Sequence, residues 1–279
     1  MVIGLALQGD CMVDYKIERA ATGIEGFDAL VEGGLPRGTN VLLTGAPGTG
    51  KSIFVLEYLY QGALNGENGL YISVDSSLPM IRQQAKLFGW DIEKLEQEGK
   101  LFFLQVPLDK MKFNLFEMIE SVKKQIGAKR VVFDSLATFA INLDLFTIPL
   151  GYAGSIASSV SVDSARDNST ITDKGDKIFY TGNSEKRMIF LILAELRNLG
   201  TTNLVITYGD LSGNQLTVDG VSEFECDGII QMHNELIGAK RMRSMEIVKM
   251  RDTNNSPYIH DVQLSSAGFV IKPAEELKL

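Results

Sequence analysis

The chain has 279 residues, of which 45% are hydrophobic, so it can bury a full core and we expect one globular domain. Its net charge of −8 excludes a general polyanion-binding surface, and any contact with nucleic acid needs a local basic patch. The two cysteines, Cys11 and Cys226, form neither a disulfide framework nor a metal-ligand spacing, which is typical of a cytoplasmic protein. No apolar run reaches the length of a membrane-spanning helix, so we expect no membrane partner.

The first residues, MVIGLALQGDCM, are apolar but lack the basic flank and the long core of a signal peptide. Met12 stands before a more ordinary start, so residues 1–11 are either a dispensable extension or the result of a start codon assigned too early. We expect residues 1–21 to be an N-terminal extension, residues 22–273 to be the main domain and residues 274–279 to be a tail.

Strand-like runs alternate with helix-like runs along the first two thirds of the chain. The expected strands span residues 40–45, 69–75, 101–106, 130–135 and 202–208, and the expected helices span residues 51–64, 77–88, 92–97, 115–126 and 187–199. This alternation predicts an α/β fold with a mostly parallel central sheet and helices on both faces. In the last third, strands with short connections are expected near residues 228–233, 244–250, 259–264 and 269–271. We expect these strands as antiparallel additions to one sheet edge.

One segment interrupts the alternation. Residues 145–187 hold eleven Ser and Thr residues, balanced charges and few large apolar side chains. A loop of this length inside a compact domain is usually functional or without fixed structure. The segment follows the strand that ends at Asp134 and the short helix behind it.

A glycine-rich stretch follows the first strand and opens the first helix. It fits the pattern G-x-x-x-x-G-K-[ST] and consists of Gly45, Ala46, Pro47, Gly48, Thr49, Gly50, Lys51 and Ser52. The glycines let backbone N–H groups face phosphate oxygens, the lysine places a charge at the β- and γ-phosphates, and the Ser52 hydroxyl can bind Mg²⁺. The helix that starts at Lys51 points its positive end at the same anion. A glycine-rich turn also fits the pattern by chance, but its place between a buried strand and a helix predicts binding of a nucleotide with Mg²⁺.

An acidic residue ends a neighbouring strand of the predicted sheet. The run RVVFDS places Asp134 directly after apolar residues. An aspartate at a strand end is often a plain cap, so alone it carries little weight. Together with the phosphate cradle, it predicts a carboxylate that holds Mg²⁺ through water. Ser52 and Asp134 are therefore the expected metal-binding residues.

The stretch from Thr22 to Ser52 resembles the RecA superfamily, and most closely the KaiC-like ATPases and the archaeal RadA paralogues. A T-G-x-x-x-x-D segment leads through G-G-x-P-x-G to the glycine-rich motif, and the matching residues are Thr22, Gly23, Asp28, Gly33, Gly34, Pro36 and Gly38. Further similar stretches are QAKLFGWDIEKLEQEGKL, the pair Asp134-Ser135, ECDGII and VKMRDTNNS. The resemblance covers about residues 22–273, apart from the segment at 145–187.

The resemblance implies a RecA-type core that binds nucleotide between the subunits of a ring or filament, with a hexamer-like homo-oligomer as the expected assembly. In KaiC-like proteins a Lys-x-Arg pair on a late strand reaches the γ-phosphate of the neighbouring subunit, and Lys249 and Arg251 match that pair. Such an arginine stabilises charge in the transition state. The family usually continues with glycine, whereas this chain has Asp252. Without the resemblance, the pair would be read as two basic side chains on a solvated strand.

The expected water-activating residues depart from the family pattern. Active relatives carry two adjacent glutamates at the end of the second strand, and one of them orients or deprotonates the attacking water. This chain has Asp75 and Ser76 at the matching positions, so one carboxylate is missing and the other is one methylene shorter. A displacement on the order of 1 Å lowers a rate by roughly 100-fold. We therefore expect tight binding of Mg-ATP and slow hydrolysis, with Asp75 as the base.

Two classes of function remain open, and the first is an accessory ATPase of DNA recombination or repair that binds single-stranded DNA or a recombinase. In RecA-type recombinases two loops hold DNA, and residues 145–187 and 209–223 occupy the matching positions. Aromatic and basic side chains in the first segment could stack bases and follow phosphates, although five acidic residues balance its five basic ones. A solvated loop and a protein-docking loop are the alternatives for this segment.

The second class is a KaiC-like signalling protein that assembles with ATP and hydrolyses little or none of it. Clock-type KaiC proteins phosphorylate an adjacent Ser-Thr pair shortly before the aspartate that Asp227 matches, whereas this chain has Glu223 and Phe224 there. That difference argues against clock-style autophosphorylation, and the acidic net charge argues against strong DNA binding. The position of the enlarged segment favours the DNA-linked class, by analogy of fold position.

Overall fold

The computed structural model describes residues 17–74, 76–106, 115–141, 184–209 and 215–274. Asp75, the first sixteen residues and most of the segment at 145–187 lie outside this described part, so the expectations about them stay predictions. Among the described residues, no helix is both long and apolar enough to cross a bilayer.

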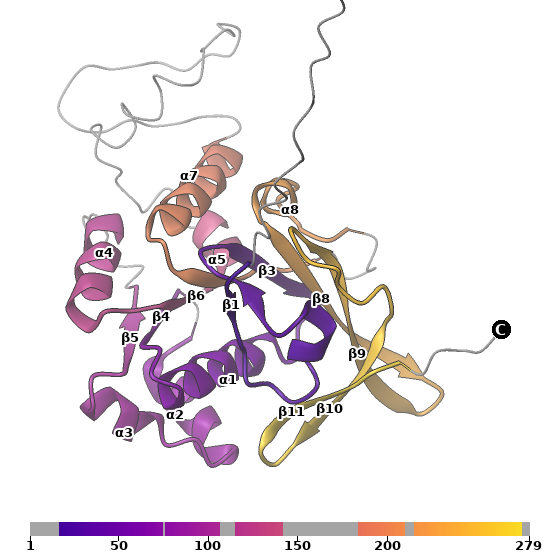
Figure 1. The fold of residues 1–279 in the computed structure, drawn as a ribbon. Helices are drawn as coiled ribbons and strands as arrows, with labels where there is room; N and C mark the ends of the chain where they lie inside the picture. The colour runs from indigo at the N-terminus through magenta and orange to yellow at the C-terminus, as the bar shows by residue number, and fades with distance from the viewer. Residues whose placement is uncertain (1–16, 75, 107–114, 142–183, 210–214, 275–279) are drawn as a thin grey trace, which may run out of the picture.

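A nine-stranded sheet runs through the described residues in the order β11-β10-β9-β8-β3-β7-β6-β4-β5 (Figure 1). Its strands are β3 (Asn40–Gly45), β4 (Gly69–Ser73), β5 (Leu101–Gln105), β6 (Arg130–Asp134), β7 (Thr202–Ile206), β8 (Gly228–Ile237), β9 (Lys240–Met250), β10 (His260–Ser265) and β11 (Gly268–Lys272). Neighbouring strands are parallel from β5 to β8 and antiparallel from β8 to β11. The predicted α/β class, with antiparallel strands added at the C-terminal edge, is confirmed.

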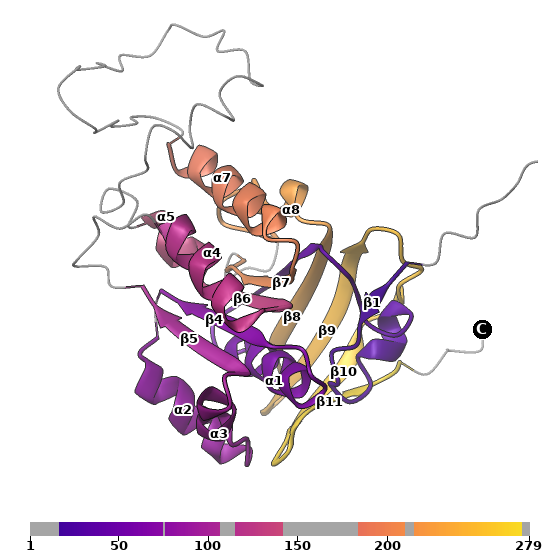
Figure 2. The ribbon, with the colours of Figure 1, turned by 60° about the vertical axis from the view of Figure 1, so that its left-hand side comes forward.

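Helices cover both faces of the parallel part of the sheet (Figures 1 and 2). One face carries α1 (Lys51–Leu64), α2 (Leu78–Leu87) and α3 (Ile92–Gln97), and the other carries α4 (Leu115–Ile126), α5 (Leu136–Ile141) and α7 (Ser184–Asn198). Each face has its own cluster of buried apolar side chains, because the parallel strands are buried on both sides. A short helix, α8 (Ser222–Glu225), leads into β8.

The hairpin of β8 and β9 is longer than the sequence predicts. The strands were expected at residues 228–233 and 244–250, but their pairing continues to Ile237 and Lys240. On β8 the pairing with β3 ends at Met232, and on β9 the pairing with β10 reaches Arg243, so only residues 235–237 and 240–242 form a two-stranded ribbon. Its residues Leu236 and Ile237 are 64% and 57% exposed. A ribbon without a buried face lacks apolar alternation, so the sequence pattern does not reveal it.

The first described residues pack against the last strands. Strand β1 (Arg19–Ala20) pairs with β2 (Leu35–Pro36), and Glu25 forms a parallel bridge with Val270 of β11. The N–H of Ser256 donates to the carbonyl of Leu30 at 2.9 Å. The segment before β3 therefore contacts β11, the strand at one edge of the sheet.

Candidate nucleotide-binding site

The glycine-rich motif forms the turn between β3 and α1. Gly45, Gly48 and Gly50 have φ angles of 142°, 81° and 107°, which other residues rarely adopt. A Cβ atom on Gly45 would lie 2.2 Å from the carbonyl oxygen of Met232, so a side chain has no room there. Because α1 starts directly after Gly50, the free N–H groups of its first turn face the same loop. The turn therefore has the shape that phosphate binding needs.

Lys51 lies in this turn with its ammonium group almost withdrawn from solvent. Its Nζ donates to the carbonyls of Gly45 at 2.7 Å and Ala46 at 3.1 Å, and lies 4.6 Å from the centre of the Tyr208 ring. Burial lowers the pKa of Lys51 to about 8, and the Asp134 carboxylate partly opposes this effect. A bound phosphate would offer the ammonium a full opposite charge, so the site favours an anion.

Ser52 and Asp134 come together beside the cradle, as the sequence predicts. The Ser52 hydroxyl donates to Oδ2 of Asp134 at 3.1 Å, although the two residues lie on elements separated by β7. Asp134 ends β6 and is only 3% exposed. A hydroxyl and a carboxylate are the oxygen donors that Mg²⁺ uses, so this pair fits the ion that accompanies ATP.

Tyr71 is a residue of this site that the sequence reasoning missed. Its hydroxyl donates to the same Oδ2 of Asp134 at 2.5 Å, and its ring stacks on Phe103 with centroids 5.6 Å apart. In the sequence, an aromatic residue inside an apolar strand indicates only a core position. The structure shows that this buried side chain also fixes the direction of the Asp134 carboxylate.

A cavity of about 310 Å³ opens over the cradle. Its lining residues are Pro47, Gly48, Gly50, Lys51, Ser52, Ile53, Gln84, Ile206, Tyr208, Arg243 and Leu264. Arg243 comes from β9, and its buried Nε has no hydrogen-bond partner among the described residues. The far wall is thus built from α2, β9, β10 and the end of β7, which no contiguous motif marks. The combination of a phosphate loop and a partly apolar wall suits a nucleotide.

Behind the cradle, α1 carries a buried acid. Glu57 is 3% exposed and accepts a hydrogen bond from the N–H of Phe269 at 2.8 Å. Burial raises the pKa of Glu57 to about 7, this hydrogen bond opposes the rise, and the charge of Glu25 adds to it. The Phe269 ring in turn occupies the space beside Gly50, where a Cβ would lie 2.9 Å from its Cζ. Glu57 therefore supports the wall against which the phosphate loop rests.

Lys249 and Arg251 lie away from this cradle. Met250 pairs with Gly228, which pairs with Val41 at the start of β3, whereas the cradle follows the other end of that strand. With a rise of about 3.3 Å per residue, the distance along β3 is roughly 13 Å. Arg251 is an exposed ion-pair partner of Asp227, with Nη1 2.9 Å from Oδ1. The two residues therefore lie at the opposite end of β3 from the cradle.

The expected base, Asp75, lies outside the described residues. Its neighbour Ser76 is described, and the backbone there is held by Ser73. The Ser73 hydroxyl donates to the carbonyl of Ser76 at 2.7 Å and accepts from the Ser76 N–H at 3.1 Å. The role of Asp75 stays a prediction.

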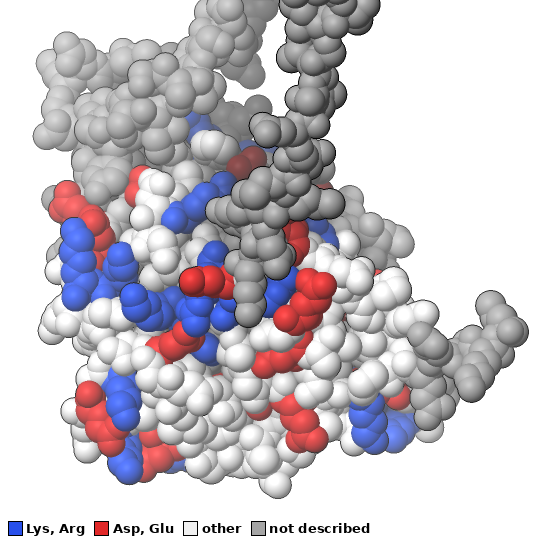
Figure 3. Space-filling view, viewed as in Figure 1, with Lys and Arg blue, Asp and Glu red and all other residues white. Residues whose placement is uncertain are grey.

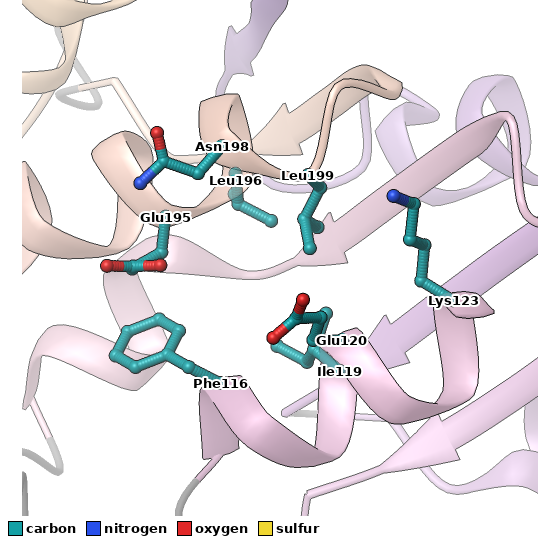
Figure 4. A pocket seen from close by; sticks show the side chains of 8 residues that line it. All are labelled: Phe116, Ile119, Glu120, Lys123, Glu195, Leu196, Asn198 and Leu199. Atoms are coloured by element: carbon teal, nitrogen blue, oxygen red, sulfur yellow. The ribbon is translucent and has the colours of Figure 1, made fainter. Parts of the chain in front are cut away.

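Another cavity, of about 110 Å³, lies between α4 and α7 (Figure 4). Glu120 and Glu195 face it from the two helices, over a floor that includes Ile119 and Leu196. Burial raises the pKa of Glu195, a hydrogen bond from Asn198 opposes the rise, and Glu120 adds to it. Lys123 and Asn198 also line this cavity, but it has no glycine-rich turn like that of the cradle.

Comparison with known proteins places the chain among ATPases. The family described as "ATPase: KaiC" matches residues 20–145 and 160–276. The chain is 28% identical over 282 residues to the UPF0273 protein MJ1359 of Methanocaldococcus jannaschii, which covers 94% of this chain and 100% of that protein. It is 29% identical over 273 residues to the circadian clock oscillator protein KaiC of Synechococcus elongatus, covering 94% of this chain but only 46% of the clock protein.

A solved structure shares the fold. The KaiC-like protein PH0186 from Pyrococcus horikoshii superimposes with a TM-score of 0.71 at 29% sequence identity, covering 92% of this chain and 100% of that one. The resemblance seen in the sequence to RecA-type, KaiC-like ATPases is thereby confirmed.

Proposed function

The chain belongs to the KaiC family of RecA-type ATPases, and from this premise we propose that it binds Mg-ATP between subunits and uses the nucleotide to control its own assembly, with slow hydrolysis. The observation that carries the proposal is the cradle from Gly45 to Ser52 beside Asp134, roofed by a cavity of about 310 Å³. A cytoplasmic location stays a prediction from the cysteine usage.

The residues of the cradle divide the work of nucleotide binding. Backbone N–H groups of the loop and the Lys51 ammonium hold the phosphates, while Tyr208, Arg243 and Leu264 are placed to contact the rest of the nucleotide. Ser52, and Asp134 through water, would hold Mg²⁺, which supplies positive charge against the phosphate oxygens. Asp75 would orient the attacking water, and its short side chain is the reason that we expect slow turnover.

Assembly is part of the proposal because Lys249 and Arg251 cannot reach the nucleotide of their own subunit. In KaiC-like proteins this pair reaches the γ-phosphate of the neighbouring subunit, and its position at the far end of β9 is compatible with such a contact in this chain. A ring or filament in which the subunits associate head to tail supplies such a contact at every nucleotide site within it. The chain spans less than half of the clock protein, so neither the clock activity nor its autophosphorylation is part of the proposal.

A DNA-linked role is the second candidate. The observation that favours it is the position of the long segment between α5 and α7, where RecA-type recombinases hold DNA. Against it, basic side chains on the face seen in Figure 3 are interleaved with acidic ones, and the net charge is −8. Binding of single-stranded DNA depends on a positive groove, so strong salt-dependent binding would support this candidate.

One set of measurements separates the two candidates. ATP binding and particle mass are measured with and without Mg²⁺, and turnover is measured with and without single-stranded DNA at two salt concentrations. Assembly on Mg-ATP with slow turnover that ignores DNA supports the assembly protein. Turnover that DNA stimulates and salt weakens supports the recombination accessory. A chain that binds no ATP, or stays monomeric with Mg-ATP at all concentrations, contradicts the proposal.

A further inference from the structure

We call Lys249 and Arg251 the finger residues, because the resemblance implies that they reach the γ-phosphate of a neighbouring subunit. Both contact one short segment, residues 223–227, which contains the end of α8 and the residues that lead into β8. Lys249 Nζ donates to the carbonyls of Glu223 at 3.2 Å and Cys226 at 2.7 Å. Arg251 pairs with the carboxylate of Asp227, and its backbone N–H donates to the Asp227 carbonyl at 2.9 Å. The end of β9 is thus bound to this segment through both side chains and main chain.

The Asp227 carboxylate has a fixed position of its own. Its Oδ2 accepts from the backbone N–H of Asn40, the first residue of β3, at 3.1 Å. The Asp227 N–H donates to the Asn40 carbonyl at 2.8 Å. Arg197, in the last turn of α7, donates to Oδ2 at 3.3 Å. The Asp227 side chain is only 14% exposed, and the central strand and α7 together hold its carboxylate in one place. Figure 2 shows α7 and α8 side by side above the start of β8.

Lys249 and Arg251 are held in different ways. Lys249 donates two of its three N–H groups to main-chain carbonyls of residues 223–227, so its ammonium ties β9 to this segment. Arg251 has five N–H donors, and the Asp227 contact uses Nη1 alone. Its side chain is 54% exposed, so the rest of the guanidinium is open to a group from outside the subunit.

We propose that Asp227 is a positioning residue that presents Arg251 to the nucleotide of the adjacent copy, with Lys249 fastening the segment that carries Asp227. A guanidinium held at one nitrogen has fewer orientations left to lose, so its other donors can meet a phosphate at a lower cost in side-chain entropy. Because Arg197 binds the same carboxylate, the end of α7 takes part in setting the finger. This inference rests on the proposed function, since it needs nucleotide bound between subunits.

Mixed assemblies test the inference separately from the proposed function. One subunit carries Lys51→Ala, which cannot hold nucleotide but keeps its finger, and the other carries Arg251→Ala, which holds nucleotide but has no finger. A slowly hydrolysed fluorescent ATP analogue is loaded on the Arg251→Ala subunit, and its release rate is followed. Adding the Lys51→Ala subunit should slow release by about tenfold, the effect of one charge-assisted hydrogen bond of ~1.5 kcal/mol.

Asp227→Asn is then added to one subunit at a time. In the finger-bearing Lys51→Ala subunit it should abolish most of the tenfold slowing, whereas in the Arg251→Ala subunit it should leave the slowing in place. A purely structural role for Asp227 would not depend on which subunit carries the change. The asparagine carbonyl can still accept from Asn40, so the variant should fold, which its melting temperature checks. If it does not fold, Arg197→Ala in the finger-bearing subunit is used, with a loss of about two- to threefold expected.

Each result has a distinct meaning. If the mixture of Lys51→Ala and Arg251→Ala subunits does not slow release of the analogue, the proposed binding of nucleotide between subunits is wrong. A second result is that the mixture without an Asp227 change slows release, and the mixture with Asp227→Asn in the finger-bearing subunit slows it by the same factor. In that case Arg251 acts on the adjacent copy, but the positioning role of Asp227 is overturned. If Asp227→Asn abolishes the slowing whichever of the two subunits carries it, Asp227 has a structural role and the inference is also overturned.

Discussion

Replacing Glu57 with glutamine should make the protein more stable at alkaline pH. Glu57 is buried behind the phosphate loop, and its charged form is disfavoured because burial removes its hydration. Glutamine has nearly the same shape and carries no charge at any pH. Its carbonyl oxygen can accept the hydrogen bond that the Phe269 N–H now donates to the carboxylate. The substitution therefore removes a titrating group and leaves the packing in place.

The magnitude follows from the pKa of Glu57, which is raised from 4.5 to about 7 in the folded protein. The favourable contribution of the neutral form is fully present below pH 4.5, where the unfolded chain is also protonated, and is lost as the pH rises to 7. A difference of roughly 2.5 pH units at about 1.4 kcal/mol each corresponds to about 3 kcal/mol, to order of magnitude. Glu57→Gln should thus match the parent near pH 4 and exceed its free energy of unfolding by about 3 kcal/mol at pH 8.

The assay is denaturant unfolding of parent and variant from pH 4 to pH 8, without nucleotide. The matched control is Glu235→Gln on the exposed ribbon, for which the difference from the parent should stay within about 0.5 kcal/mol at every pH. A difference between Glu57→Gln and parent that does not change with pH would show that Glu57 is not a desolvated acid. A variant less stable than the parent at pH 8 would refute the reasoning outright.

Four further predictions concern the nucleotide site. Lys51→Ala should weaken ATP binding by more than about 100-fold in a fluorescence titration, because a buried ammonium pairs with the phosphates; unchanged binding would contradict the cradle assignment. Tyr71→Phe should raise the Mg²⁺ concentration needed for ATP binding by about tenfold, since a hydrogen bond to a carboxylate is worth ~1.5 kcal/mol, while Tyr60→Phe, another stacked tyrosine, should not. Arg251→Ala should weaken ATP binding by about tenfold, the loss of one charge-assisted hydrogen bond, and lower turnover by roughly 100-fold or more, and equal turnover would remove the finger role. Asp75→Ala should abolish the remaining turnover, and a variant as active as the parent would show that another group activates the water.

The sequence predicts the phosphate cradle well because its parts are contiguous and their chemistry is specific. Eight successive residues have to form one turn, and the strand before them and the helix after them are marked by apolar patterns. The position of Asp134 beside the cradle was also predictable, because a parallel strand that ends in an acid brings that acid to the same sheet edge, while its role stays a prediction. The alternation of strands and helices likewise fixed the class of fold.

The rest of the site was not predictable because its residues lie on separate elements. Tyr71 has the sequence context of a core residue, and only the side-by-side packing of β4 and β6 shows that its hydroxyl meets Asp134. Arg243 stands in a basic run of β9, and nothing in that run marks it as a residue that lines the cavity over the cradle. Asp227 was matched to its family position, yet its hold on Arg251 depends on strand register. Side-chain contacts between distant elements need the register of the sheet, which composition and spacing do not contain.

The order of strands in the sheet has a consequence for how the protein is made. Strand β3, which carries the phosphate cradle, has β7 and β8 as its two neighbours, with Val41 paired to Leu204 on one side and Gly228 on the other. While the ribosome is still adding residues before β7, β3 has neither partner, and both of its edges are open. Pairings this distant in the chain form slowly, and open apolar edges invite association with other chains. The cradle can therefore be completed only after the last third of the chain has emerged. Nucleotide can stabilise the fold only at this final step.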